Sequence, residues 1–308
     1  MKRLVHGAIF AHIFIASIVI SAIALGFSTF RNHIGLHSDV YCTLDGTLST
    51  TKLIQSHRSY CIKSDASSKV FVANTPAGYS FSIVDDEANT TKDFAIIHTK
   101  QMHIIIARKD LAYFQHLHPT YDASTGVFTL SDLTFPADGK YRIFADFAVD
   151  RGVKDAEGMP FPITISEDVE VGSNYPSLSL GDETRTKTFD GLKVSLATHG
   201  ALKSGEENML MFSIAQDSKP VTDLQQYLGA LGHSVILREN TLDFIHAHPM
   251  DTTTQNGTVS FMVNFPLEGM YKVFTQFQRD GTVFTTDFVV NVAEGVNAPV
   301  PQMDHTMH

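Results

Sequence analysis

Cysteine is scarce in this chain of 308 residues, which contains only Cys42 and Cys61. Because no cysteine follows residue 61, the rest of the chain has no thiolate ligand to offer. This absence excludes a thiolate-ligated electron-transfer copper site, and the His-Cys-His arrangement of multicopper oxidases is missing as well. Any metal site in that part of the chain must use other side chains.

Signatures of common enzyme classes are also absent. The chain has no Gly-x-Ser-x-Gly motif, no phosphate-binding loop and no dinucleotide fingerprint. It has no cluster of Lys and Arg, and its formal net charge of −10 argues against nucleic acid or an anionic membrane surface as a partner. We therefore expect a protein that is not an enzyme, with a zinc-dependent hydrolase as the alternative.

Charged side chains are missing from residues 4–30, a stretch of 27 residues between Arg3 and Arg31. About 20 apolar residues suffice to cross a bilayer as a helix, whereas the apolar part of a cleaved signal peptide has about 7–15. We therefore predict that residues 1–30 form an uncleaved signal anchor, a single transmembrane helix whose basic end faces the cytoplasm. The bulk of the chain would then be extracytoplasmic, in the periplasm or at the cell surface. Cleavage after Ala24 is the alternative.

Residues 31–66 read as a polar, irregular extracytoplasmic segment that contains both cysteines. An even pair of cysteines in an exported protein commonly forms a disulfide, so we predict one between Cys42 and Cys61. The alternative is a metal site that adds His37 or His57, although no Cys-x-x-Cys motif is present.

One histidine pattern, His-x(12)-His-x-His, occurs twice in the chain with a constant offset of 130 residues. The same offset relates Gly139 to Gly269 and Tyr141 to Tyr271. The chain is therefore a tandem duplication. The pattern accounts for six of the fifteen histidines: His103, His116, His118, His233, His246 and His248.

The spacing places each histidine set on a predicted β-hairpin. Residues 101–107 and 113–118 are extended in character, and residues 108–112 between them are polar enough to turn. Antiparallel pairing then places residue 103 opposite 116 or 118, while residues 116 and 118 project to the same face. Directly opposed residues share a face, with Cβ atoms about 4.5–5.5 Å apart. Three imidazoles are therefore expected to converge on one side of the hairpin in each repeat.

Other polar or sulfur-containing residues near these sets are expected to lie outside the site. Strand alternation points Met102 to the opposite face from its neighbouring histidine. His98 and His199 have no counterpart in the other repeat, which favours a surface position. Asp146 is replaced by Gln276 at the offset of 130, so we expect neither to be essential to a shared site.

Short strand candidates separated by Gly, Pro, Asp and Asn predict a mainly β protein. Each repeat has about the length of an immunoglobulin-like or cupredoxin-like β-sandwich domain. Helical periodicity is confined to a possible turn at residues 223–228. We predict repeats at 67–172 and 188–293, a linker at 173–187 and a flexible tail at 294–308. Strands of the first repeat are expected at 69–73, 79–85, 98–108, 113–118, 126–130, 139–147 and 163–171.

Three converging imidazoles suggest a metal site, because neutral imidazole is a good ligand for copper and zinc. The alternatives are half-buried strand histidines bonded to the backbone, or a hydrogen-bonded corner that stabilises the hairpin. The tail favours copper, since thioether and imidazole together suit copper better than zinc or magnesium. Its candidate ligands are Met303, His305, Met307 and His308.

The first repeat reads MHII at 102–105, FQHLHP at 114–119 and FPADGKY at 135–141, and the second repeat follows the same order. This pattern resembles a group of exported bacterial proteins that are often regarded as heavy-metal-associated. The Met/His tail resembles those of periplasmic copper-resistance proteins, whose small sandwiches bind copper through His and Met. These resemblances imply a metal-handling β-sandwich protein on the outer face of the membrane.

The sequence therefore predicts a membrane-anchored, extracytoplasmic metal-binding protein that acts in copper sequestration, delivery or resistance. The expected ligands are the six repeated histidines, with the tail as a mobile capture arm, and zinc is the alternative metal. We expect a metal-transport or acceptor protein as its partner. The alternative function is a tandem sandwich interaction module whose histidines are structural.

Overall fold

The computed structural model shows a mainly β protein, as predicted. Every regular element in its described residues is a β-strand. Residues 223–228 form an irregular segment with isolated bridges at Gln225 and Tyr227, so the predicted turn of helix is wrong. The described residues are 40–41, 60–64, 71–85, 87–150, 158, 160, 162–173, 175–251, 253–254 and 256–296.

The membrane anchor predicted for residues 1–30 lies outside these ranges, and it stays a prediction. Among the residues that the structure does describe, no helix is long and apolar enough to cross a membrane.

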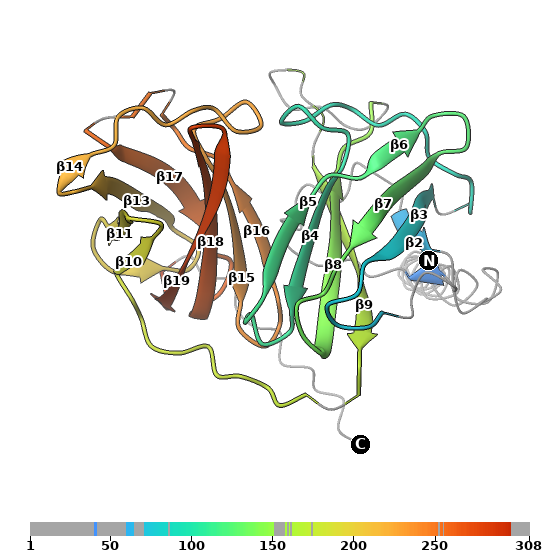
Figure 1. Ribbon diagram of the computed structural model, residues 1–308, viewed down its shortest axis with the longest axis horizontal. Coiled ribbons are helices and arrows are strands. Elements are labelled where there is room, and N and C mark those ends of the chain that lie inside the picture. The colour runs from blue at the N-terminus through green and yellow to red at the C-terminus, as the bar shows by residue number, and fades with distance from the viewer. Residues whose placement is uncertain are drawn as a thin grey trace, which may run out of the picture. The chain divides into compact units, whose positions relative to one another are not determined.

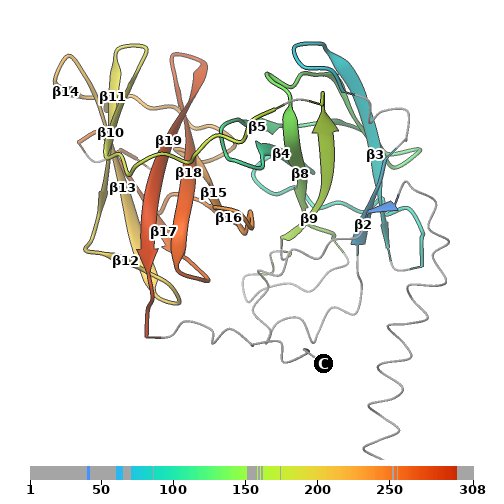
Figure 2. The same cartoon turned by 90° about the horizontal axis from the view of Figure 1, so that it is seen from below.

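The first repeat is a sandwich of two antiparallel sheets (Figures 1 and 2). One sheet has the order β1 (Val40–Tyr41), β2 (Tyr60–Ser64), β3 (Ala77–Asp85), β7 (Val127–Leu133) and β6 (Thr120–Asp122). The other has the order β5 (Phe114–Leu117), β4 (His103–Arg108), β8 (Gly139–Phe147) and β9 (Ile163–Val171).

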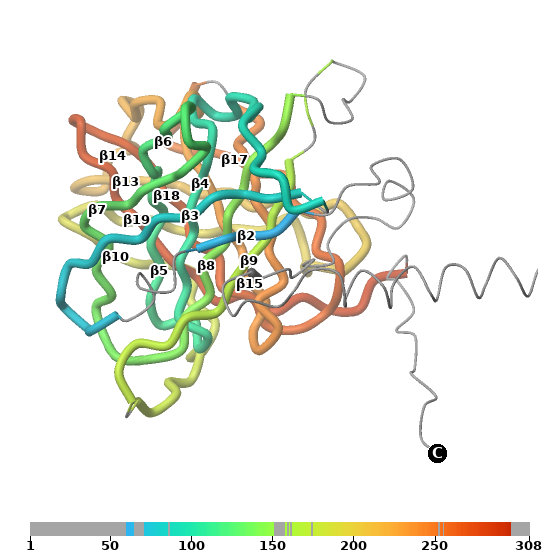
Figure 3. The backbone as a smooth tube through the Cα atoms, turned by 90° about the vertical axis from the view of Figure 1, so that its right-hand side faces the viewer, coloured from blue at the N-terminus to red at the C-terminus, as the bar shows by residue number. Residues whose placement is uncertain are grey.

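Strand alternation builds the core of this sandwich. On β3, the side chains of Tyr79, Phe81 and Ile83 all point inward and are at most 2% exposed. They pack against residues of the facing sheet, including Ile104 and Ile143. β2 pairs with β3, as the tube in Figure 3 also shows, so the sandwich begins before the expected boundary at residue 67.

The second repeat has the same two-layer plan. One sheet has the order β10 (Thr186–Phe189), β11 (Leu192–Thr198), β13 (Glu207–Gln216) and β14 (Lys219–Pro220), with β17 (Thr258–Asn264) also paired to β13. The other has the order β12 (Leu202–Lys203), β19 (Thr282–Ala293), β18 (Gly269–Arg279), β15 (His233–Arg238) and β16 (Phe244–Ala247). Between β9 and β10 the chain runs as an extended segment without strands (Figure 1).

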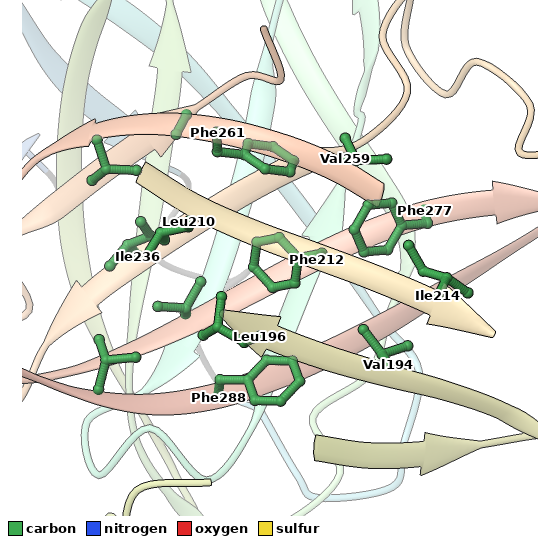
Figure 4. Packing of buried hydrophobic residues seen from close by; sticks show 14 of the residues in the cluster. Val194, Leu196, Leu210, Phe212, Ile214, Ile236, Val259, Phe261, Phe277 and Phe288 are labelled. Atoms are coloured by element: carbon green, nitrogen blue, oxygen red, sulfur yellow. The ribbon is translucent and has the colours of Figure 1, made fainter. Parts of the chain in front are cut away.

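Aromatic side chains fill the core of the second sandwich. Phe212 lies between Phe261, Phe277 and Phe288, with ring centroids 5.5, 5.8 and 5.9 Å away, respectively (Figure 4). All four rings are fully buried. Both sheets contribute to this cluster, so two tandem β-sandwich domains are confirmed.

The recurring Gly-x-Tyr motif has the same structural role in both repeats. The Tyr141 hydroxyl donates a hydrogen bond to the carbonyl oxygen of Ala137, and the Tyr271 hydroxyl donates to that of Leu267, each at 2.8 Å. A buried tyrosine that ties a strand to the turn before it is characteristic of immunoglobulin-like sandwiches. The motif therefore belongs to the fold rather than to a binding site.

Each repeat has one sheet that is buried on both faces. In β4 all six residues are buried: Ile104 and Ile106 face the core of their own sandwich, while Ile105 and Ala107 face the other repeat. A third apolar cluster combines residues from the two repeats and is separate from both sandwich cores. The two repeats therefore contact each other through the outer faces of these sheets.

The contact is reciprocal between equivalent residues. Arg142 of the first repeat donates a hydrogen bond to the carbonyl oxygen of Thr241, at 3.4 Å. Its counterpart Lys272 donates to the carbonyl oxygen of Leu111, the counterpart of Thr241, at 2.9 Å. Such exchange, in which residue i contacts j and j contacts i, is the mark of a two-fold interface. Here both partners belong to one chain.

Candidate metal centre

The hairpins place the histidines as their spacing predicts. Ile105 pairs with His116, and Ile104 pairs with Leu117. Continuing this register places His118 opposite His103, and all three histidines share the face of Ile105. This face is turned toward the other repeat rather than toward the sandwich core.

In the first repeat the three imidazoles meet directly. His103 Nδ1 lies 3.0 Å from His116 Nε2 and 3.2 Å from His118 Nε2. His103 is fully buried and His116 is 9% exposed. One ring nitrogen from each residue lies within 4.8 Å of the others. We refer to His103, His116 and His118 as the first triad.

The second repeat repeats the arrangement with His233, His246 and His248, which we call the second triad. One ring nitrogen of each lies within 4.8 Å of the others. Among the described residues, His233 Nδ1, His246 Nε2 and His248 Nε2 are buried and have no hydrogen-bond partner. Buried polar atoms are nearly always hydrogen-bonded, so three unsatisfied nitrogens in one cluster point to a ligand.

Backbone carbonyl groups orient the first histidine of each triad. His103 Nε2 lies 3.1 Å from the carbonyl oxygen of Ile97, and His233 Nε2 lies 2.9 Å from that of Tyr227. Because a carbonyl oxygen only accepts, Nε2 must carry the proton in each ring. In the neutral ring Nδ1 then keeps a lone pair, and this atom faces the triad. Metal-bound histidines are generally oriented by this kind of outer hydrogen bond.

Side chains from the opposite repeat orient the second histidine of each triad. His246 Nδ1 donates a hydrogen bond to Asp146 Oδ2 at 2.8 Å, and His116 Nδ1 donates to Gln276 Oε1 at 2.8 Å. Thr164 also donates to Asp146, at 3.0 Å. These contacts leave Nε2 of His246 and His116 to face their triads.

One prediction about neighbouring residues is therefore wrong. Asp146 and Gln276 were expected to lie outside the site, yet each contacts a triad. They are directly paired with His103 and His233 on the adjacent strand. A sequence signal for them exists, because both repeats place a polar residue at this position, within the buried part of the strand.

His98 was expected at the surface, but it belongs to the cluster. Its ring stacks on His248, with centroids 3.7 Å apart and planes 20° from parallel. The backbone reaches this position because His98 and Thr99 have φ of 49° and 68°, which turns the chain where residues 98–102 were expected to be strand. His199 is exposed and Met102 packs in the first sandwich core, so both of those predictions are confirmed.

Burial disfavours protonation of the histidines. It lowers the pKa of His118 and of His233 to about 3 each, and that of His98 to about 4, with neighbouring histidines acting in the same direction. The pKa of His116 is also well below its ordinary value, first because of burial and then because of His118 and His103. At neutral pH these rings are therefore uncharged and keep a lone pair for a metal.

Asp146 remains a carboxylate despite its burial. Burial opposes its ionisation, but the hydrogen bonds from His246 and Thr164 favour the charged form, and its pKa stays below the ordinary value. The second triad is therefore hydrogen-bonded to a negative charge, whereas the first triad is hydrogen-bonded to the neutral amide of Gln276 and has Asp146 only as the strand neighbour of His103.

Two nitrogen separations in the first triad match those of a metal-bound set. Nitrogens about 2.0–2.1 Å from one ion lie about 2.8–3.4 Å apart when their bond angles are between 90° and 109°. The measured separations of 3.0 and 3.2 Å from His103 Nδ1 fall within this range. Three imidazoles suit zinc and copper, and they leave a further coordination position.

The other predicted site residues are not tested by the structure. Cys42 lies outside the described residues, while Cys61 is fully buried in β2, and their disulfide stays a prediction. The four predicted tail ligands also lie outside the described residues: Met303, His305, Met307 and His308.

Both repeats match the same domain family. The family is described as "Domain of unknown function (DUF8832)", and it matches residues 59–165 and 187–294. No curated protein sequence matches the chain.

Solved structures with similar arrangements are distant from this chain. Titin immunoglobulin tandem domains A164–A165 are 12% identical, with 73% of this chain and 91% of that chain covered and a TM-score of 0.17. The titin I-band fragment I67–I69 is 10% identical, with coverages of 77% and 66% and a TM-score of 0.20. Salmonella alpha-2-macroglobulin is 9% identical with a TM-score of 0.24, and this chain, of which 77% is covered, spans 15% of its length. All three TM-scores are below 0.5, so the fold assignment comes from the strand pairing itself.

Proposed function

We propose that this chain, which belongs to the DUF8832 family, is a metal-binding protein whose two histidine triads are the binding sites. The observation that carries this proposal is the set of three buried nitrogens without hydrogen-bond partners in the second triad. In His246 and His233 the outer partners only accept hydrogen bonds, so in the neutral rings the other nitrogen of each keeps a lone pair inside the cluster. A cation bound there would satisfy all three.

Copper is the metal that we propose first. Imidazole alone does not separate copper from zinc. The preference for copper comes from Met303 and Met307 in the tail, because thioether sulfur suits copper. The resemblance of both repeats to exported heavy-metal-associated proteins supports the same function. Together with the predicted anchor in residues 1–30, it leads us to propose sequestration, delivery or resistance outside the cytoplasm.

Metal titration of the full-length protein tests this proposal. We expect up to two Cu⁺ ions held by the triads against a competing chelator, with Zn²⁺ titrated in parallel. His246→Ala and His248→Ala together should remove one ion, and His116→Ala with His118→Ala should remove the other. The control is His199→Ala, because this histidine is exposed and outside the cluster.

The tail is tested separately. Removal of residues 297–308 should leave binding by the triads intact and abolish any additional, weaker copper uptake. Copper retention that is unchanged in all four triad substitutions would contradict the triads as binding sites, and failure of the wild-type protein to retain any metal would contradict the proposed function.

A structural role for the histidines is the second candidate. It is favoured by their position beside the apolar contact between the repeats, where His118 Nε2–H donating to His103 Nδ1 would form a hydrogen-bonded corner. The protein would then be a tandem sandwich that presents surfaces to another protein. Unfolding without metal discriminates: in this case the His118→Ala substitution would lower stability as much in metal-free buffer as in metal-containing buffer.

A further inference from the structure

The two triads are close enough to act as one centre. Between triads, the ring centroids of His103 and His246 are 5.8 Å apart and those of His116 and His233 are 6.4 Å apart. Within the first triad, the centroids of His103 and His116 are already 5.3 Å apart. The separation between the triads is thus little larger than the separation inside one of them.

The halves of this centre also depend on each other's repeat. The second triad receives its carboxylate, Asp146, from the first repeat, and the first triad receives its amide, Gln276, from the second repeat. His98 of the first repeat stacks on His248. Neither repeat alone therefore contains a complete set of ligands and supporting groups.

Comparison of equivalent positions in the two repeats shows how the surroundings of the two triads differ chemically. At the offset of 130 residues, Asp146 corresponds to Gln276, and His98 corresponds to Leu228. The second triad thus has a carboxylate and an additional imidazole where the first triad's equivalent positions have an amide and an aliphatic side chain. The triad histidines themselves are identical in the two halves.

We propose that the two triads form one paired centre whose halves fill in a fixed order, the second triad first. This inference rests on the proposed function, since it concerns the order in which the same triads bind metal. A carboxylate that accepts a hydrogen bond from a ligand histidine makes that ring a better donor, and such outer partners contribute about 10–100-fold in metal affinity. The negative charge of Asp146 also attracts the first cation directly.

The first ion makes the second one harder to bind. Both triads are largely buried, with His103 and His233 at most 1% exposed, so solvent screens a charge there poorly. A cation in the second triad therefore repels a cation that enters the first triad. Asp146 offsets one charge, and no described acidic residue is bonded to the first triad.

Cu⁺ titration of the full-length protein against a chromophoric chelator tests the order of filling, with Zn²⁺ as a second probe. We expect two steps whose dissociation constants differ by at least about 10-fold. Replacing one member of each triad identifies the steps: His248→Gln should remove the tight step, and the matched variant His118→Gln should remove the weak one. Thermal unfolding of each variant shows whether it is folded.

The carboxylate is tested by exchanging the supporting groups. Asp146→Asn should weaken the tight step by about 10–100-fold, while Gln276→Glu should strengthen the weak step and bring the two steps closer together. His98→Leu introduces the residue found at the equivalent position of the second repeat, Leu228, and should weaken only the tight step.

The outcomes separate this inference from the proposed function. Two equal and independent steps in the wild-type protein, or a tight step that survives His248→Gln, would overturn the order of filling and leave metal binding intact. Equal effects of His118→Gln and His248→Gln on the tight step would also overturn it. Absence of any binding would overturn the proposed function and this inference with it.

Discussion

Phe114 of the first repeat lies flat on Phe274 of the second, with ring centroids 4.4 Å apart and planes 8° from parallel. Their counterparts in the duplication, Phe244 and Phe144, form the equivalent contact in reverse but are tilted, with centroids 5.0 Å apart and planes 32° from parallel. The histidines continue this reciprocal surface, because His116 lies two residues after Phe114 on β5. Docking of the repeats and assembly of the metal centre are therefore expected to be linked.

Phe274→Ala tests this linkage. Removing a buried phenylalanine costs about 3–5 kcal/mol, and here the loss falls on the contact between the repeats. We expect metal affinity to fall as well, because the outer partners of His116 and His246 come from the opposite repeat. Calorimetric metal titration of the folded variant measures the effect.

The matched control is Phe261→Ala, which removes a buried ring from the second sandwich core instead. It should lower the free energy of unfolding by a similar amount and leave the metal affinity of the folded protein unchanged. Equal metal affinities for Phe274→Ala and Phe261→Ala would show that docking and metal binding are independent.

Acidification should destabilise the metal-free protein. The folded-state pKa values of His118 and His233 are about 3, below the value of about 6.5 expected in the unfolded chain. The unfolded chain therefore binds more protons than the folded protein below pH 6.5. The contribution of these histidines to the free energy of unfolding is full above that pH and is lost as the pH falls toward 3. Each such histidine contributes up to about 1.4 kcal/mol per pH unit in that window.

Urea unfolding between pH 8 and pH 4.5 measures this loss. Asp146 adds to the loss only at lower pH than this range, because its pKa is below the ordinary value of 3.8. His118→Gln should flatten the pH dependence, and His199→Gln, at an exposed position, should not. A free energy of unfolding that stays constant below pH 6.5 would rule out the neutral, buried histidines inferred from the structure.

Tyr79→Phe should destabilise the first sandwich without affecting the metal centre. The Tyr79 hydroxyl donates a hydrogen bond to Glu167, a buried carboxylate that Ser64 also contacts, at 3.1 Å. Removing a donor from a buried charge costs about 1–3 kcal/mol. Tyr121→Phe is the control, because its hydrogen bond to the Lys92 carbonyl oxygen is exposed. Chemical unfolding should show the larger loss for Tyr79→Phe, and metal stoichiometry should match the wild type.

Gly139→Ala should overpack the start of β8. A Cβ atom there would lie 2.3 Å from Arg108 Nε, and Arg108 is held by hydrogen bonding to Pro176, at 3.0 Å. Displacing it is expected to cost about 1–3 kcal/mol. Gly78→Ala on β3 is the comparison, because a Cβ atom there would meet nothing within 4 Å. Similar midpoints of thermal unfolding for the two variants would contradict the close approach of Arg108 as the reason for a glycine at residue 139.

Much of each sandwich could be predicted from the chain. The hairpin register that joins His103, His116 and His118 follows from side-chain alternation and a short turn, both of which are local. The sequence predicted strands at 139–147 and 163–171, and β8 and β9 have these bounds. The strand expected at 98–108 begins only at His103, because the left-handed backbone at His98 and Thr99 is not apparent from hydrophobic pattern.

The contacts of the residues that support the triads could not be predicted from the sequence. Asp146 contacts His246 across 100 residues of sequence, and His116 contacts Gln276 across 160 residues. The sequence of β4 is apolar on both faces, which predicts that both faces of its sheet are buried. It does not predict which surface packs on the outer face.

The amino-acid sequence by itself therefore determined the duplication, the two sandwiches and the convergence of three imidazoles within each repeat, because these depend on strand period and short-range pairing. Only the tertiary structure decided that the two triads adjoin, that Asp146 and Gln276 each orient the triad of the other repeat, and that His98 stacks on His248. These contacts depend on the docking of two folded surfaces. The residues that meet there are far apart in the chain, so no local sequence pattern predicts which of them are in contact.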